Sequence, residues 1–114
     1  MTVVNRASAA HYTWGGGCDG WRLLDRPDLS VIDERIPPGL GEVRHHHGVA
    51  RQLFVILDGT LTMERDGDVV HLHAGDAAEV TPGTPHRVWN DTQADVRMLV
   101  ISAPSTRGDR TDLS

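Results

Sequence analysis

The chain has 114 residues, enough for one domain and too few for a second hydrophobic core of useful size. Hydrophobic residues make up 39% and charged residues 24%, a balance typical of a folded globular chain and not of a disordered one. The formal net charge of −5 argues against binding to duplex nucleic acid, and the longest apolar run, residues 53–57, is too short to span a membrane.

The beginning of the chain shows no sustained periodicity. Three consecutive glycines at 15–17 favour a flexible turn, and we expect residues 1–20 to be irregular. No apolar stretch follows Arg6, so this segment does not resemble a secretory signal. Cys18 is the only cysteine and has no partner for an internal disulfide. These features favour a cytoplasmic location.

The rest of the chain reads as short strands separated by turn residues. Segment 29–36 alternates, with Ile32 and Ile36 on one face, and predicts a half-buried strand. Segment 51–57 is apolar on both faces and predicts a fully buried strand. Further strands are expected over 21–24, 43–47, 60–65, 69–72, 77–80, 86–90 and 96–102. The sequence therefore predicts one all-β barrel or sandwich over residues 21–103, followed by a tail over 104–114.

Three histidines and a glutamine have the spacing of a metal site. His45 and His47 are two positions apart, so on a strand their side chains share a face. Gln52 follows on the next strand, and His86 comes after a loop rich in proline and glycine. Imidazoles suit zinc, copper, iron and nickel, and three ligands that leave open positions are typical of a reactive metal. Taken alone, the run of histidines at 45–47 is equally compatible with an exposed loop.

Two spaced motifs resemble those of the cupin family. The first cupin motif is a glycine, five residues, His-x-His, three or four residues, an acid, six residues and a glycine; Gly39, His45, His47, position 52 and Gly59 fall at these intervals. The second motif is a glycine, seven residues, a glycine, two residues, a histidine, three residues and an asparagine. Its matches are Gly75, Gly83, His86 and Asn90, with Thr81 in place of the usual proline.

The resemblance implies a double-stranded β-helix, or jelly-roll barrel, with one divalent transition metal in its mouth. Carried over by position, His45, His47 and His86 are the metal-binding histidines, and the motif glycines shape turns. The metal implied is iron(II), zinc, nickel or manganese. Small cupins commonly form dimers through a sheet face, so we expect a homodimer.

Position 52 departs from the family pattern, because most metal-binding cupins have glutamate there and this chain has Gln52. The amide oxygen is still able to coordinate a metal, but it is neutral. A neutral ligand set lowers the affinity for the cation and sharpens its Lewis acidity. The alternative is that Gln52 only forms hydrogen bonds, and that the three histidines hold the metal alone.

Other residues are candidates for the wall of a pocket around the metal. Phe54 and Ile56 share the parity of Gln52, and Met63 belongs to a neighbouring strand. Core packing is the alternative role for all three. Trp21 and Trp89 are candidates for the same wall or for a subunit contact. The opposite face of the same strand carries Leu53, Val55 and Leu57, which a partner subunit or a second sheet would cover.

The remaining histidines and the cysteine give weaker signals. His71 and His73 share a face but lie outside both motifs, which favours a solvated strand face over a second metal site. His11 has no partner visible in the sequence. Cys18 has no neighbouring base or cation in sequence, so we expect an inert thiol.

Three functions remain compatible with the sequence, because a fold does not choose its chemistry. The first, which the resemblance favours because dioxygenase cupins share the three-histidine site, is a dioxygenase-like oxidoreductase that acts on a small organic substrate through bound iron. The second is a Lewis-acid isomerase or polyketide-cyclase-like enzyme with zinc or nickel. The third is a binding module without catalysis. Glu34, Glu42 and Glu79 are possible general bases, and the sequence prefers none of them.

Overall fold

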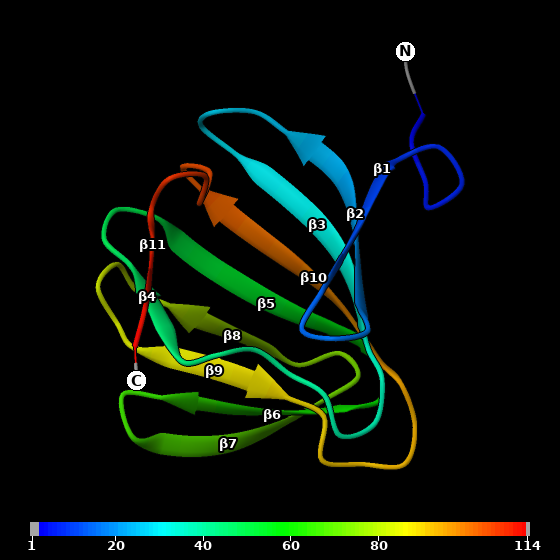
Figure 1. The fold of residues 1–114 in the computed structure, drawn as a ribbon, viewed down its shortest axis with the longest axis vertical. Coiled ribbons are helices and arrows are strands. Elements are labelled where there is room, and N and C mark those ends of the chain that lie inside the picture. Colours follow the sequence, from blue (N-terminus) through cyan, green and yellow to red (C-terminus); the bar gives the residue numbers. More distant parts are fainter. Residues whose placement is uncertain (1–2, 114) are drawn as a thin grey trace.

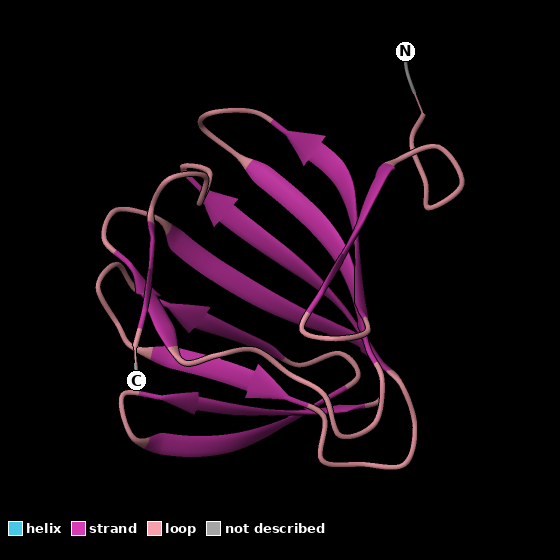
Figure 2. Cartoon of the chain, in the orientation of Figure 1, coloured by secondary structure: helices cyan, strands magenta, loops and turns pink. Residues whose placement is uncertain are grey.

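The chain folds into two antiparallel β-sheets around a common core (Figures 1 and 2). This computed structural model describes residues 3–113, and that range contains no α-helix. Its strands are β1 (Ala10–Trp14), β2 (Cys18–Asp25), β3 (Ser30–Ile36), β4 (His45–His47), β5 (Arg51–Asp58), β6 (Thr60–Arg65), β7 (Asp68–His73), β8 (Ala77–Val80), β9 (His86–Trp89), β10 (Val96–Ala103) and β11 (Arg110–Asp112). The predicted all-β barrel is confirmed.

The two sheets are interleaved in sequence, as expected of a double-stranded β-helix. One sheet has the order β1-β2-β3-β10-β5-β8, and the other has the order β11-β4-β9-β6-β7. After β3 the chain passes from one sheet to the other at every step except the β6–β7 hairpin, and β4 and β5 lie in different layers although only a short turn joins them. The metal-site residues predicted on these two strands therefore approach one another from opposite walls.

Local turn chemistry explains why several strand boundaries are predicted correctly. β6 and β8 agree with the predicted strands at both ends. Between β6 and β7, Asp66 and Gly67 have φ values of 52° and 92°, the left-handed backbone of a tight hairpin turn. Residues of this type are the ones that tolerate such angles, so the hairpin is visible in the sequence.

The expectation of an irregular segment over residues 1–20 is wrong for most of the described part. β1 and β2 form an antiparallel hairpin, with Ala10 opposite Arg22 and Trp14 opposite Cys18. The glycines at 15–17 are its turn, and all three have positive φ. β1 alternates between apolar and polar residues over only five positions and pairs with β2 alone, so the alternation is too short to stand out beside the glycine run. Residues 1–2 lie outside the described residues.

The expectation of a tail over residues 104–114 is also wrong. β11 pairs antiparallel with β4, and Arg110, Thr111 and Asp112 lie opposite His47, His46 and His45. Figure 1 shows the C-terminal segment crossing in front of β4, at the edge of the five-stranded sheet. The segment is short and charged, so its pairing depends on a distant strand that the local pattern does not report.

The core lies between the sheets, and the two faces of β5 differ in burial. Phe54 and Ile56 point inward and are buried with Leu61, Met63 and Val88 of the opposite sheet. The outer face of β5 differs from the prediction of a fully buried strand. Leu53 is 37% exposed and Leu57 is 40% exposed in the single chain. This apolar face motivated the expected homodimer, which stays a prediction.

Within residues 3–113, no helix has the length and apolarity needed to cross a membrane.

Candidate metal centre

The three predicted histidines converge at one point inside the barrel. His45 and His47 lie two residues apart on β4, and both side chains point inward. His86 begins β9 and lies directly opposite His45 in the ladder between these strands. One ring nitrogen from each of the three lies within 4.8 Å of the others, and all three side chains are buried. This separation suits ligands of a single ion, because metal–nitrogen bonds are about 2.0–2.1 Å long.

Backbone carbonyl groups orient all three imidazoles in the same way. The Nδ1 atom of His45 lies 2.7 Å from the Val43 carbonyl oxygen, and Nδ1 of His86 lies 2.9 Å from that of Thr84. Nδ1 of His47 lies 3.1 Å from the carbonyl oxygen of Asp109. A carbonyl oxygen only accepts, so each Nδ1 carries the proton and donates it. Each Nε2 therefore keeps a free lone pair, the form that a metal ligand needs.

Burial keeps these imidazoles neutral. It lowers the pKa of His45 from 6.5 to about 4, and it also lowers the pKa values of His47 and His86. The hydrogen bonds to backbone carbonyls act in the opposite direction but do not outweigh desolvation. At neutral pH the histidines therefore do not have to lose a proton before they bind a cation.

Gln52 faces the histidines from the opposite sheet. It lies on β5, is 6% exposed, and donates a hydrogen bond from Nε2 to Ser102 Oγ over 3.2 Å. Among the described residues, Gln52 Oε1 and His86 Nε2 are the buried side-chain polar atoms without a hydrogen-bond partner. Unpaired buried acceptors are rare in proteins. Two of them beside three converging imidazoles fit the coordination of a cation, and Gln52 as the fourth ligand stays a prediction.

Asp109, just before β11, supports the site in a way that the sequence did not reveal. Its carboxylate accepts hydrogen bonds from the backbone N–H groups of Gly48, Val49 and Ala50, at 2.9–3.2 Å. Its own carbonyl oxygen accepts the hydrogen bond from His47 Nδ1. One residue of the C-terminal segment therefore fixes both a histidine and the turn that leads from β4 to β5.

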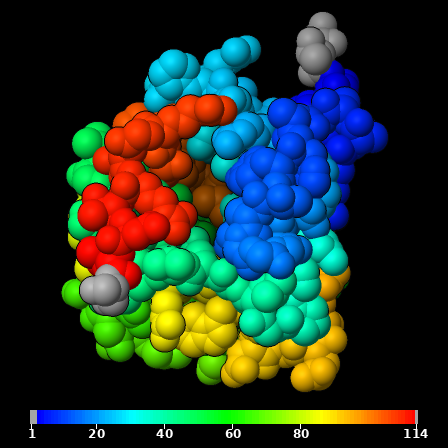
Figure 3. Space-filling view, in the orientation of Figure 1, coloured from blue at the N-terminus to red at the C-terminus, as the bar shows by residue number. Residues whose placement is uncertain are grey.

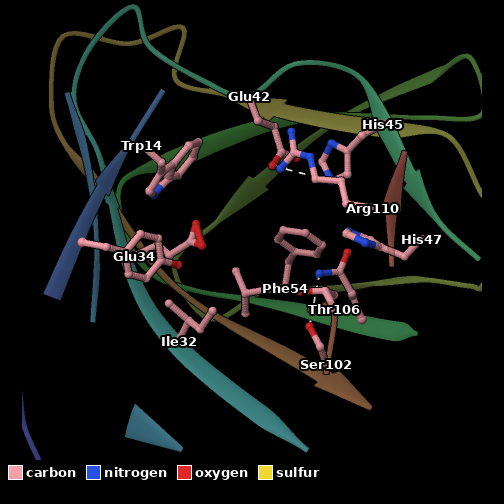
Figure 4. A pocket seen from close by; sticks show the side chains of 13 residues that line it. Trp14, Ile32, Glu34, Glu42, His45, His47, Phe54, Ser102, Thr106 and Arg110 are labelled. Carbon is pink, nitrogen blue, oxygen red and sulfur yellow. Dashed lines mark hydrogen bonds and ion pairs between the residues drawn. The ribbon is translucent and has the colours of Figure 1, made fainter. Parts of the chain in front are cut away.

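A cavity of about 190 Å³ opens beside the histidines. Figure 3 shows the hollow between the N-terminal residues, in blue, and the C-terminal segment, in red. Side chains from both sheets and from both terminal segments line it (Figure 4): Tyr12, Trp14, Ile32, Glu34, Glu42, His45, His47, Gln52, Phe54, Val100, Ser102, Thr106 and Arg110. A benzene ring fits in a cavity of about 150 Å³, so the volume suits one small organic molecule.

Glu42 and Glu34 place two carboxyl groups in this cavity. Oε2 of Glu42 lies 3.9 Å from His45 Nε2, and its Oε1 accepts a hydrogen bond from the Val88 N–H over 3.1 Å. Glu34 lies across the cavity on β3 (Figure 4). Burial raises the pKa of Glu42 well above 4.5 and that of Glu34 to about 8. Glu79, the third base considered, is exposed and forms an ion pair with Arg51 at 2.6 Å, so it lies outside the cavity.

The cavity wall differs in part from the predicted one. Phe54 lines it as expected, whereas Ile56 and Met63 are fully buried in the core. Trp21 and Trp89 do not line it, because each neighbours an inward-facing residue on its strand and so points outward: Trp21 stacks under Arg6 and Trp89 under Arg87. The other aromatic residues of the wall, besides Phe54, are Tyr12 and Trp14 of the unpredicted strand β1.

The weaker sequence signals agree with their structural alternatives. His71 and His73 are exposed on β7, and the described residues form no histidine, cysteine or carboxylate cluster there that would hold an ion. His11 does have a partner, Asp19, at 2.8 Å. Cys18 is buried, and desolvation raises the pKa of its thiol to about 11, as expected for an inert side chain.

Comparisons with known proteins agree with this architecture. The cupin domain family model matches residues 32–102, which is more than half of the chain. The chain is similar to the polyketide cyclase RemF from Streptomyces resistomycificus, with 16% identity, a TM-score of 0.86, and coverage of 100% of this chain and 86% of that one.

Two further solved structures are similar in fold. One is a predicted oxalate decarboxylase from Thermotoga maritima, with 20% identity, a TM-score of 0.83, and coverage of 91% of this chain and 100% of that one. The other is an uncharacterized conserved protein with a double-stranded β-helix domain from Klebsiella pneumoniae, with 20% identity, a TM-score of 0.82, and coverage of 100% and 98%. At these identities the likeness concerns the fold alone. The chain belongs to the cupin family, and its two interleaved sheets form the double-stranded β-helix of that family.

Proposed function

We propose that this cupin is a metal-dependent enzyme that moves protons on a small organic carbonyl compound, as an isomerase or cyclase does. The observation that carries the proposal is a cavity lined by two of the three Nδ1-protonated histidines, His45 and His47, and by the carboxyl groups of Glu34 and Glu42. A Lewis acid and a proton acceptor on one substrate are the two elements that enolisation requires.

The metal would be held by His45, His47 and His86 through their Nε2 atoms, with Gln52 Oε1 as the fourth donor. When bound, a divalent metal polarises a carbonyl group and makes the neighbouring C–H bond more acidic. All four donor groups are neutral, so the ligands do not offset the charge of the cation. A redox-inert ion such as zinc or nickel fits this role.

Glu42 is the residue best placed to exchange a proton with the substrate. The hydrogen bond from Val88 fixes one of its oxygens and leaves Oε2 on the side of His45. Gly41 allows the backbone before Glu42 to lie close to β9, where it forms a bridge with Trp89. A Cβ atom at Gly41 would lie only 2.5 Å from the Val88 carbonyl oxygen, so the close approach requires glycine. The loop before β4 therefore lies flat against β9 and directs Glu42 into the cavity.

The apolar wall keeps bulk water away from the reacting atoms. Phe54, Ile32 and Val100 line one side of the cavity, and Trp14 closes over it from β1. Water exclusion strengthens the electrostatic interactions of the carboxyl groups and protects a reactive intermediate from side reactions. Arg110 and Thr106 leave a polar rim on the C-terminal side.

The two carboxyl groups favour this function over the dioxygenase that the sequence placed first. Oxygen chemistry requires open positions on the iron but does not require an acid–base residue beside it, so it gives Glu42 no catalytic role. The likeness to a polyketide cyclase and to a predicted oxalate decarboxylase does not decide, because each identity is 20% or lower. The binding-only alternative gives Glu42, beside His45, no role in proton transfer.

The test is proton exchange on a small ketone probe. Protein loaded with zinc or nickel is incubated with hydroxyacetone or acetylacetone in deuterated water, and NMR follows the loss of the α-proton signal. We expect catalysed exchange that falls about 10²–10⁴-fold in Glu42→Gln and is abolished when the three histidines are replaced by alanine. Glu79→Gln is the matched control outside the cavity.

Absence of exchange with every metal, together with oxygen consumption by the iron-loaded protein, would favour the dioxygenase. Absence of both activities would favour the binding module. Equal exchange rates in native protein and Glu42→Gln would be compatible with the metal role but would show that Glu42 is not the proton acceptor.

A further inference from the structure

A row of three residues crosses the sheet at the end of the cavity that lies away from the histidines. Tyr12 on β1 is opposite Gly20 on β2, and Gly20 is opposite Glu34 on β3. Residues opposite one another in a sheet share a face. Tyr12 and Glu34 both line the cavity, so the row faces inward.

The missing side chain of Gly20 lets the tyrosine ring reach across the row. A Cβ atom placed at Gly20 would lie only 2.6 Å from both Cε1 and Oη of Tyr12, closer than real contacts allow. The phenol therefore occupies the space that a side chain at position 20 would fill, between β1 and Glu34. The Arg22 guanidinium, two residues along β2 from Gly20, lies 4.5 Å from the ring centroid and forms a cation–π contact with it.

Glu34 ends in the cavity without a partner in the protein. It is 9% exposed, and among residues 3–113 no hydrogen bond or ion pair joins its carboxyl group to another side chain or to the backbone. Figure 4 shows this carboxyl group pointing toward the centre of the cavity, beneath Trp14 and across from His45 and His47. The carboxyl oxygens are therefore not sealed in the core but open to the cavity, where they are free to form hydrogen bonds with a bound molecule.

Burial determines the protonation state of the Glu34 carboxyl group. It raises the pKa of this carboxyl group to about 8, while Arg110 and Arg22 lower it and Asp33 raises it further. At neutral pH the group is therefore mainly protonated, and it offers one O–H donor and one carbonyl acceptor. The Tyr12 hydroxyl, whose pKa is raised by burial and by Glu34, adds a second donor that also accepts.

We propose that Tyr12 and Glu34 form a polar subsite that binds a hydroxyl or carbonyl oxygen of the substrate, while the opposite end of the substrate faces the histidines. This inference rests on the proposed function for the metal end only. The cavity of about 190 Å³ holds roughly one six-membered ring with its substituents. The substrate class is therefore a ring-sized carbonyl compound with a second oxygen function at its far end, such as a cyclic hydroxyketone, and dihydroxybenzenes serve as unreactive probes of the same size.

The experiment compares ligands that differ by one hydroxyl group. Phenol, resorcinol and hydroquinone are titrated into zinc-loaded protein, and ligand-detected NMR gives each dissociation constant. We expect at least one dihydroxybenzene to bind about threefold to tenfold more tightly than phenol, as one added neutral hydrogen bond provides. Tyr12→Phe and Glu34→Leu should each reduce this advantage and leave the phenol affinity within about twofold. Glu79→Leu, outside the cavity, should change neither affinity.

Gly20→Ala is the most specific variant, because it keeps both polar groups and displaces the ring that lies over position 20. We expect it to reduce the advantage as Tyr12→Phe does, which keeps the test informative if Glu34→Leu fails to fold. Equal affinities for all three ligands, no binding of any of them, or an advantage that survives all three cavity variants would overturn the subsite.

Measuring the same affinities after zinc removal distinguishes a failure of the polar subsite from a failure of the histidine metal site. If the histidine site is wrong, stripping zinc leaves every affinity unchanged while the hydroxyl advantage persists in native protein. If the subsite is wrong, affinities respond to zinc but the added hydroxyl gives no advantage that Tyr12 or Glu34 controls.

Discussion

Asp109 accepts the hydrogen bond of His47 Nδ1 on its carbonyl oxygen at 3.1 Å, while its carboxylate accepts the N–H groups of the turn that follows His47. The two residues are 62 positions apart in the chain. The C-terminal segment thus contributes to the candidate metal centre, although its composition resembles a tail.

This relationship predicts a loss of metal affinity in Asp109→Ala. Removing the carboxylate frees the turn at 48–50 and lets the carbonyl of residue 109 move away from His47. Changes to groups that orient a metal ligand typically cost 10-fold to 100-fold in affinity, and we expect a loss in that range for zinc. Competition with a chromophoric chelator measures it.

Asp28→Ala, in an exposed turn, is the control and should bind zinc as the native protein does. Unchanged zinc affinity in Asp109→Ala would show that β4 holds His47 without help from the C-terminal segment.

The sequence predicts the centre of the fold better than its edges, for physical reasons. Alternation and turn residues mark β6 and β8 because both signals are local. His45 and His47 share a face because of the two-residue period of a strand, and their spacing to His86 matches a family pattern. The distance between ligands on separate strands is a tertiary property that only the structure provides.

The residues that sequence reasoning missed belong to short strands at the edges of the two sheets. Tyr12, Trp14 and Arg110 lie on β1 and β11, whose pairing partners decide their place. Strand parity, however, was an available signal for the outward-pointing Trp21 and Trp89. Each is next to a residue that faces inward, Gly20 or Val88, and so had to point away from the cavity.

Restoring the family's usual carboxylate at position 52 should have opposite effects on the two forms of the protein. Gln52→Glu adds a negative charge beside a cation, and we expect zinc to bind about tenfold or more tightly. Without zinc the same carboxylate is buried and lacks a counter-charge, so the free energy of unfolding should fall by about 1–3 kcal/mol. Thermal unfolding with and without zinc measures both effects.

Gln52→Leu is the companion variant, since it removes the amide and adds no charge. If both variants bind zinc as tightly as native protein, Gln52 is not a ligand and the histidines hold the ion alone.

Glu34 predicts a distinct dependence of stability on pH. Its pKa is about 8 in the folded chain and near 4.5 when unfolded, so between these values the folded state binds more protons than the unfolded state. The free energy of unfolding contributed by this group therefore decreases as pH rises from about 4.5 to 8, by at most about 5 kcal/mol. Urea unfolding across this range should show a shallower decrease for Glu34→Gln than for native protein. Parallel curves would contradict the buried, protonated state of Glu34.

The outer face of β5 predicts a homodimer. Leu53 and Leu57 are partly exposed there, and Arg51 and Glu79 place one charge of each sign beside Leu53. Such a patch is able to match its own copy about a two-fold axis. Light scattering at micromolar concentration should give twice the chain mass of 12.5 kDa, and Leu53→Glu should give the single mass. A native monomer would remove this expectation.

The metal content of the protein tests the central claim most directly. Protein purified without a histidine tag is analysed for elements beside a variant in which His45, His47 and His86 are all replaced by alanine. The account predicts about one divalent metal per native chain and none in the variant, and zinc or nickel would favour proton chemistry over the oxygen chemistry that iron would indicate. A native protein that stays empty after reconstitution with iron, zinc, nickel and manganese would contradict the metal centre.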